Sequence, residues 1–216
     1  MDPKTAARAI AESKLIVVLR HIPLESVEDV ASALGEGGVR VVEVALNTAN
    51  ALRQIQLLRR YDFCLGAGTV LEEDNAKAAL GAGADFLFSP IRSPFFLPFC
   101  RQHGLLGIPG GLTPTEIYSL HGEGAKFIKV FPGSLGGSDY LQEILAPLEG
   151  LKLVPAGGVN LETLHGFLAA GAAAVAVGTE IADPRLARDN NFREIASRAA
   201  LFTGKIKSFS GISAQA

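Results

Sequence analysis

The feature that most constrains the fold is a series of eight short apolar runs, which recur about every 20 to 25 residues. They lie at 15–20, 39–46, 63–70, 85–90, 105–110, 125–132, 151–158 and 173–178. Segments with helical periodicity separate them, for example at 26–38, 50–61, 72–84 and 161–172. Continuously apolar strands that alternate with helices are typical of a parallel sheet covered by helices. The chain is therefore predicted to have an α/β fold.

Eight strand–helix units within 216 residues favour a single (β/α)8 TIM barrel over an open sheet. With 48% hydrophobic residues and no linker-like segment, we expect one domain over residues 1–216. The charged segment before the first run predicts an N-terminal helix. Residues 190–207 are expected to form one or two last helices, and residues 211–216 an irregular end.

Composition and charge exclude several classes of function. A formal net charge of -2 gives no electrostatic basis for binding nucleic acid or an acidic membrane surface. No run of about 18 apolar residues exists, so no membrane span is expected. Two cysteines in apolar surroundings and no signal-peptide pattern predict reduced thiols and a cytoplasmic protein. The four histidines lack metal-ligand spacing, so no metal site is predicted.

In a barrel of this kind, the chemistry takes place at the carboxyl ends of the strands and in the loops that follow. Polar residues and glycines gather at these positions. They are Arg20, Glu43, Asn47, Thr69, Ser89, Pro90, Thr113, Lys129, Gly157, Gly158, Gly178 and Thr179. We take this set as the candidate site.

Side-chain alternation points two charged residues into the barrel. Lys129 shares a face with Phe127 and Phe131, and Glu43 lies on the non-aliphatic face of its own run. One interpretation is a structural network in which Glu43 pairs with Lys129 or Arg20. The other is imine chemistry: burial and a nearby guanidinium would keep the Lys129 amine unprotonated and nucleophilic, and a carboxyl group would move protons.

Glycines follow the last two apolar runs, in AGGVN and VGTE. Barrels often bind phosphate at these two strands, because glycine lets backbone N–H groups approach the oxygens. The alternative is that these glycines only make tight turns.

The sequence resembles the 2-dehydro-3-deoxy-phosphogluconate (KDPG) and 4-hydroxy-2-oxoglutarate (KHG) aldolases. The resemblance rests on the segments GGVRVVEVALNT, GAGTVL, IPGGLTPTEI, FIKVFPGSLGGSDYL and PAGGVN, and on the Ser-Pro pair after the fourth run. They occur in order from about residue 15 to residue 180.

The resemblance implies a role for each matching residue. Lys129 would form the imine with pyruvate, and Glu43 would be the general acid and base. Thr69 matches the threonine beside the pyruvate carboxylate, Thr113 lies in the matching PGxxT segment, and Phe131 matches the aromatic residue beside the imine. Gly157, Gly158, Gly178 and Thr179 fall at the phosphate site.

Two positions depart from the family pattern. Asn47 stands where many members have an arginine that holds the substrate carboxylate, a contact that Arg20 would then share. Ala156 stands where many have a threonine that contacts the sugar chain. Phosphogalactonate aldolases also show Asn in the -LN- segment, so cleavage of 2-dehydro-3-deoxy-6-phosphogalactonate is an alternative.

The resemblance implies a metal-independent class I aldolase without cofactors. It would cleave 2-dehydro-3-deoxy-6-phosphogluconate to pyruvate and glyceraldehyde 3-phosphate in the Entner-Doudoroff pathway, act on 4-hydroxy-2-oxoglutarate as well, and assemble as a homotrimer. More distant alternatives are another phosphate-binding barrel enzyme, such as a thiamine-phosphate synthase, and a non-catalytic barrel. The aromatic run PFFLPF at 94–99 is either helix packing or an interface patch.

Overall fold

The computed structural model describes residues 1–213 of the chain. Each of the eight apolar runs contains at least one strand. The strands are β1 (Leu15–Leu19), β2 (Val41–Ala45), β3 (Cys64–Gly68), β4 (Phe86–Phe88), β5 (Leu106–Ile108), β6 (Gly110–Gly111), β7 (Ile128–Val130), β8 (Leu153–Pro155) and β9 (Val175–Val177). The fifth run contains β5 and the first residue of β6, which Pro109 separates.

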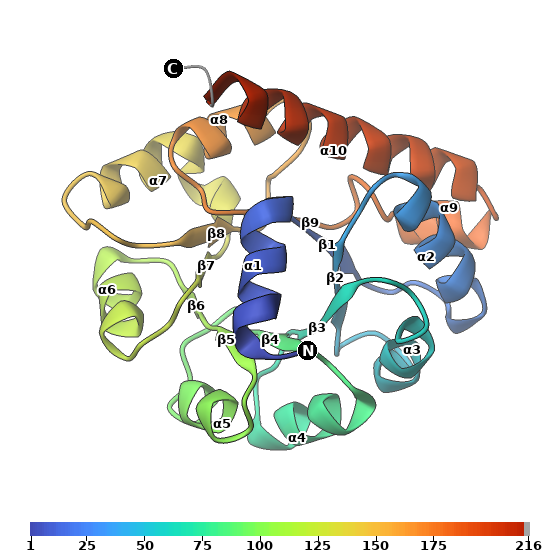
Figure 1. The fold of residues 1–216 in the computed structure, drawn as a ribbon, viewed down its shortest axis with the longest axis horizontal. Helices are drawn as coiled ribbons and strands as arrows, with labels where there is room; N and C mark the ends of the chain where they lie inside the picture. Colours follow the sequence, from blue (N-terminus) through green and yellow to red (C-terminus); the bar gives the residue numbers. More distant parts are fainter. Residues whose placement is uncertain (214–216) are drawn as a thin grey trace.

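Helices connect the strands and surround them (Figure 1). They are α1 (Pro3–Ser13), α2 (Val27–Glu36), α3 (Ala51–Leu58), α4 (Glu73–Ala82), α5 (Phe96–Gln102), α6 (Pro114–Gly122), α7 (Gly137–Leu145), α8 (Leu164–Ala169), α9 (Pro184–Arg188) and α10 (Phe192–Ser213). Two short 3-10 helices, η1 (Leu24–Ser26) and η2 (Gly133–Leu135), lie in loops. The predicted N-terminal helix is confirmed as α1.

The strands form two sheets and not one continuous ladder. Six make a curled parallel sheet in the order β5-β4-β3-β2-β1-β9, and three make a second sheet in the order β6-β7-β8. Pro109 separates the sheets on one side, since proline has no N–H to donate. On the other side a single bridge between Ala156 and Ala176 joins them. The α/β class and the parallel strands are confirmed, whereas the predicted (β/α)8 barrel is observed as these two sheets.

Buried side chains divide into two clusters, one on each side of the strands. The larger lies between the strands and the surrounding helices and contains residues such as Val42, Val44 and Ile128. The smaller faces inward and contains Val41, Phe86, Phe127 and Val154. The inward orientation predicted for the face that Phe127 shares with Lys129 is therefore confirmed for Phe127.

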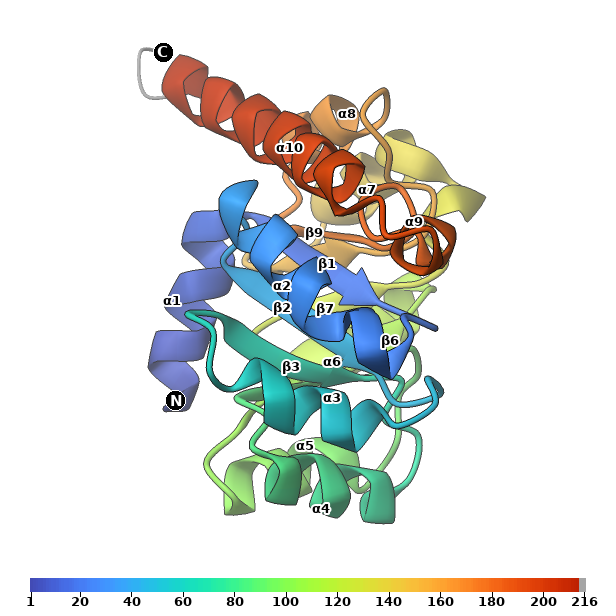
Figure 2. The ribbon, with the colours of Figure 1, turned by 90° about the vertical axis from the view of Figure 1, so that its right-hand side faces the viewer.

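Helix α1 covers one end of the strands. It crosses the centre of Figure 1 and lies against the amino-terminal ends of the strands in the side view of Figure 2. Ala6, Ala7 and Ile10 from this helix complete the inward-facing cluster. Helix α1 thus packs over the amino-terminal end of the interior, opposite the carboxyl ends of the strands, where the predicted site residues lie.

Three predictions about the remaining chain have clear outcomes. Cys64 and Cys100 are buried and free, as expected. Phe96 and Phe99 of the aromatic run are buried in the larger cluster, which supports helix packing. The irregular end predicted at 211–216 is wrong for 211–213, which continue α10, while 214–216 lie outside the described residues.

Within residues 1–213, no helix is both long and apolar enough to span a membrane.

Candidate active site

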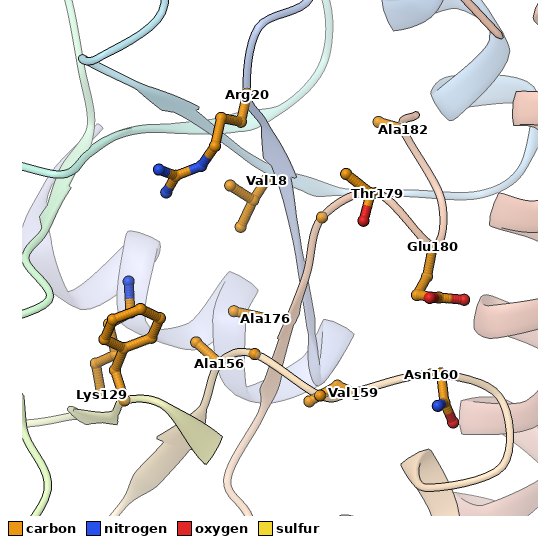
Figure 3. A pocket seen from close by; sticks show the side chains of 14 residues that line it. Val18, Arg20, Lys129, Ala156, Val159, Asn160, Ala176, Thr179, Glu180 and Ala182 are labelled. Carbon is orange, nitrogen blue, oxygen red and sulfur yellow. The ribbon is translucent and has the colours of Figure 1, made fainter. Parts of the chain in front are cut away.

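A pocket of about 330 Å³ opens at the carboxyl ends of β1, β7, β8 and β9. Figure 3 shows Arg20 and Lys129 at one end of it and Asn160 and Glu180 at the other. Its lining consists of Val18, Arg20, Lys129, Phe131, Ala156, Gly157, Gly158, Val159, Asn160, Ala176, Gly178, Thr179, Glu180 and Ala182. Seven of the predicted site residues line this pocket: Arg20, Lys129, Phe131, Gly157, Gly158, Gly178 and Thr179.

Lys129 lies in the middle of β7, and its side chain is only 5% exposed. Its Nζ atom is 4.1 Å from the ring centroid of Phe88 and 5.0 Å from that of Phe131. Burial lowers the pKa of Lys129, the charge of Glu43 raises it, and that of Arg20 lowers it further. The net direction is downward, which favours the neutral, nucleophilic amine.

Glu43 lies in the middle of β2 and is 1% exposed. Burial raises the pKa of this carboxyl group, and the positive charges of Lys129 and Arg20 oppose that rise. Its Oε2 atom has no hydrogen-bond partner among the described residues. Buried carboxyl oxygens are normally satisfied, so the unpartnered Oε2 and the raised pKa together make Glu43 a candidate proton-transfer group.

Arg20 and Thr69 are joined by a hydrogen bond, in which the Arg20 guanidinium donates to Thr69 Oγ1 at 3.3 Å. Thr69 has a φ of 57°, in the left-handed region. A β-branched residue in this region is strained by about 1–3 kcal/mol, and such strain concentrates at functional sites. The backbone at Thr69 thus holds its hydroxyl group beside the arginine at an energetic cost.

The loops after β8 and β9 form the other end of the pocket. Gly157 and Gly158 have φ values of 86° and 76°, which glycine adopts without strain. A Cβ on Gly158 would lie 2.6 Å from Ser134 Cβ and 2.9 Å from Ser134 Cα. Gly158 therefore serves the packing of this loop whatever else it does. Thr163 Oγ1 donates to the Gly158 carbonyl at 2.9 Å and so fixes the loop's shape.

Six residues in the predicted set lie outside the pocket lining: Glu43 and Thr69, described above, and Asn47, Ser89, Pro90 and Thr113. Ser89 is fully buried, its Oγ accepts a hydrogen bond from the Ile91 N–H at 3.3 Å, and Pro90 follows it. Asn47 is exposed. Thr113 caps α6, with its hydroxyl accepting from the Glu116 N–H at 3.3 Å, so its polar group has a structural partner.

Sequence reasoning missed three residues of the site. Phe88 contacts the Lys129 amine, and alternation along residues 86–88 could have placed it on the inward face. Glu180 follows Thr179 directly and Asn160 ends the AGGVN segment, so both lay within motifs that had been identified. The sequence analysis did not predict that an aromatic ring from a different strand, that of Phe88 in β4, contacts the Lys129 amine.

The pocket is lined by a buried amine of lowered pKa and by a guanidinium, and a buried carboxyl group of raised pKa lies near enough to interact electrostatically with both. An amine can attack a carbonyl carbon, the carboxyl can exchange protons with the adduct, and the guanidinium can bind a carboxylate. Within the described part of the chain, no three His, Cys, Asp or Glu side chains are grouped so that they could hold a metal ion.

Comparisons with known proteins agree with this geometry. The family model described as KDPG and KHG aldolase matches residues 7–198. A 2-dehydro-3-deoxy-phosphogluconate aldolase from Treponema pallidum is 37% identical over 158 residues, covering 70% of this chain and 75% of its own. A probable 2-dehydro-3-deoxy-6-phosphogalactonate aldolase from Rhizobium meliloti is 31% identical over 194 residues, covering 88% and 92%.

A solved structure is similar throughout. It is the crystal structure of KDPG aldolase from Legionella pneumophila, with pyruvate captured at low pH as a covalent carbinolamine intermediate. The TM-score is 0.85 at 29% identity, with 90% of this chain and 96% of that chain covered. Together with the family match over most of its length, these similarities show that the chain belongs to the KDPG and KHG aldolase family.

Proposed function

We propose that this protein is a class I aldolase that cleaves 2-dehydro-3-deoxy-6-phosphogluconate to pyruvate and glyceraldehyde 3-phosphate through an imine on Lys129. The observation that carries this proposal is the buried Lys129 amine at the inner end of the pocket, with its pKa lowered. The family membership supports the reaction, and the carbinolamine in the Legionella pneumophila relative supports its covalent course.

The first half of the reaction builds an electron sink. The neutral Lys129 amine attacks the C2 carbonyl of the substrate, and loss of water from the carbinolamine gives a protonated imine. Arg20 and Thr69, which are joined by a hydrogen bond, bind the neighbouring carboxylate. The faces of Phe88 and Phe131 stabilise the cation, since aromatic rings attract positive charge.

The second half breaks the C3–C4 bond. Glu43 takes the proton of the C4 hydroxyl, the bond electrons move onto the imine nitrogen as an enamine, and the aldehyde leaves. Glu43 then returns the proton to C3, directly or through water, and hydrolysis of the imine releases pyruvate. The raised pKa of Glu43 suits a group that must both accept and donate this proton.

The assembly is also part of the proposal. The two sheets would act as one (β/α)8 barrel in one domain over residues 1–216, supported by the Ala156–Ala176 bridge and by the short break at Pro109. We also propose that the protein is a homotrimer that acts in the Entner-Doudoroff pathway, as the family resemblance implies, and that it is cytoplasmic, as its reduced cysteines predict.

The reaction is tested by pyruvate release from a panel of phosphorylated 2-keto-3-deoxy acids and 4-hydroxy-2-oxoglutarate. We expect turnover of 2-dehydro-3-deoxy-6-phosphogluconate that resists EDTA, because the protonated imine performs the polarisation that a metal would otherwise supply. Absence of pyruvate from every substrate, or loss of activity with EDTA, would contradict the proposal.

A second candidate substrate is the galactonate epimer. It is favoured by Asn47 and by Ala156, which lines the pocket without a hydroxyl group, and by the relative from Rhizobium meliloti. The epimers differ only in the configuration at C4, so the ratio of their kcat/KM values in the same assay decides between them.

The phosphate group is proposed to bind between the loops after β8 and β9, at Gly157, Gly158, Gly178 and Thr179. Gly178→Ala is the cleanest test, because a Cβ there would lie 3.8 Å from the Val18 carbonyl oxygen, an ordinary contact. Alanine keeps the backbone N–H, but its methyl group would hold a phosphate oxygen away from that donor. We therefore expect kcat/KM for the phosphorylated substrate to fall roughly 10- to 100-fold, the value of one hydrogen bond to a charged group. Proton exchange at the methyl group of pyruvate, which needs no phosphate, should not change.

Gly81→Ala is the matched control, since Gly81 lies in α4 and an added Cβ would have no neighbour within 4 Å. Equal losses of cleavage and of pyruvate exchange in Gly178→Ala would mean that this glycine shapes the inner end of the pocket, and the phosphate assignment would be withdrawn.

A further inference from the structure

Gly68, the last residue of β3, lies beside the Glu43 carboxyl group. If Gly68 carried a side chain, its Cβ would lie 2.7 Å from Glu43 Cγ and closer still to the carboxyl carbon and Oε1. The three nearest atoms to this position all belong to Glu43. The carboxyl group of Glu43 thus occupies the space that a side chain at position 68 would fill.

The backbone of Gly68 gives no other reason for a glycine. Its φ lies outside the left-handed region, unlike that of Gly157 or Gly158. It pairs with Ala45 in the ladder between β2 and β3, and its carbonyl accepts from the Leu46 N–H at 2.8 Å, both of which any residue could do. Space for Glu43 is therefore the local constraint that excludes a side chain.

Hydrogen bonds do not fix the second oxygen of this carboxyl group. Glu43 Oε2 has no hydrogen-bond partner within residues 1–213, although the side chain is only 1% exposed. Glu43 is paired across the ladder with Gly66, two residues before Gly68, so its side chain extends along the strand toward the pocket end. The shape of the surrounding wall, with Gly68 as the open position, sets where the carboxyl group lies.

We propose that Gly68 is a positioning residue for the proposed aldolase reaction: its missing side chain forms the recess that holds the Glu43 carboxyl group beside the imine. This inference rests on the proposed function of Glu43. The proposed role depends on the space that the missing side chain leaves and not on the conformational freedom of glycine. Gly68 would thus affect the reaction although it has no functional group of its own.

The test is Gly68→Ala, measured by cleavage, by proton exchange at the methyl group of pyruvate in D₂O, and by borohydride trapping on Lys129. The added methyl group must displace the carboxyl group, and a displacement of about 1 Å can cost roughly 10²-fold in rate. We expect cleavage and exchange to fall by about that factor. Trapping of pyruvate should stay within roughly threefold, since the amine is untouched and imine formation with excess pyruvate tolerates slow proton transfer.

Gly66→Ala is the matched control on the same strand and the same face. A Cβ at Gly66 would lie 2.6 Å from Phe86 Cε1 and closer to Cζ, so this variant also overpacks the interior, but against an aromatic ring. We expect it to lower the melting temperature about as much as Gly68→Ala while keeping the exchange rate within a few-fold of wild type. Equal losses of exchange in both variants would overturn the proposal, because overpacking alone would then explain the effect.

A double variant gives an independent measurement. Glu43→Ala removes Cγ and the carboxyl group and so vacates the space that the methyl group at position 68 needs. Gly68→Ala should therefore lower the melting temperature in wild type and much less in the Glu43→Ala background. If Gly68→Ala alone does not fold, folding of the double variant supports the proposal. Failure of both, or additive losses, would contradict it.

These outcomes are distinguishable from a failure of the proposed function. Were wild type to show no imine on Lys129, the aldolase assignment would fall, whereas the coupling in melting temperature would still report whether Gly68 holds Glu43. Normal exchange in Gly68→Ala, with trapping intact in wild type, would overturn the positioning role and leave the aldolase assignment standing.

Discussion

Replacing Lys129 with methionine is expected to lower pyruvate release by at least about 10⁵-fold, because the variant has no amine to form the imine and enzymes owe 10⁶-fold or more to their whole catalytic apparatus. Methionine fills a similar volume in this buried position and removes a buried polar amino group, so the melting temperature should stay level or rise. The loss would then be one of chemistry and not of folding.

Borohydride trapping identifies the nucleophile directly. In wild type with pyruvate, reduction of the imine to a secondary amine should add one pyruvate-derived mass to the peptide that contains Lys129. Lys126, exposed and three residues earlier, provides the control: Lys126→Met should keep both label and turnover. A label on Lys126, or active Lys129→Met protein, would refute the assignment.

The pH dependence of trapping carries a sign that can be checked. Trapping rises as pH increases through the pKa of Lys129, which lies below the ordinary lysine value of 10.5 because of burial. Arg20 lowers this pKa, so Arg20→Met should move the acid limb to higher pH. Glu43 raises it, so Glu43→Gln should move the limb to lower pH or leave it in place if the carboxyl group is already neutral.

Replacing Glu43 with glutamine is expected to lower turnover by roughly 10²- to 10⁴-fold, the usual contribution of a general acid and base. Glutamine keeps the size of the side chain but cannot carry the proton from the C4 hydroxyl to C3. Trapping of pyruvate on Lys129 should survive better than turnover, and proton exchange at the methyl group should fall in parallel with cleavage.

The stability of the same variant separates the two interpretations of Glu43. With its raised pKa and its unpartnered Oε2, Glu43 should be replaceable by a neutral amide without a large change in melting temperature. Normal turnover of Glu43→Gln would remove its role in proton transfer. A variant that does not fold would instead identify Glu43 as the buried charge partner of Lys129 or Arg20.

The strands and their inward faces could be predicted because each depends on a local pattern of apolar and polar residues. Each apolar run contains a strand, and alternation alone placed Glu43 and Lys129 on the inward face. The division into two sheets could not be predicted in this way. It depends on where Pro109 meets its neighbouring strand and on how few pairs form between β8 and β9, and both depend on the register of strands far apart in sequence.

The sequence predicted the charged residues of the site but not the residues that shape the space around them. Lys129, Glu43 and Arg20 carry a charge in otherwise apolar or strand-end positions, so the sequence marks them. Phe88 and Gly68 have no such mark, because an apolar ring and a glycine in a strand are ordinary features until their neighbours are known. Thr113 shows the converse: it stands in a family motif, yet its hydroxyl group caps a helix.

The left-handed backbone of Thr69 has a consequence for anyone who improves this protein by selection. Glycine or asparagine would relax that residue, so a screen that rewards only heat resistance should enrich for them at position 69. Glycine there removes the hydroxyl group that accepts from Arg20, and the improved survivors would be poorer catalysts. Substitutions at position 69 would thus raise thermal stability at the cost of catalytic activity, so a screen should measure both properties.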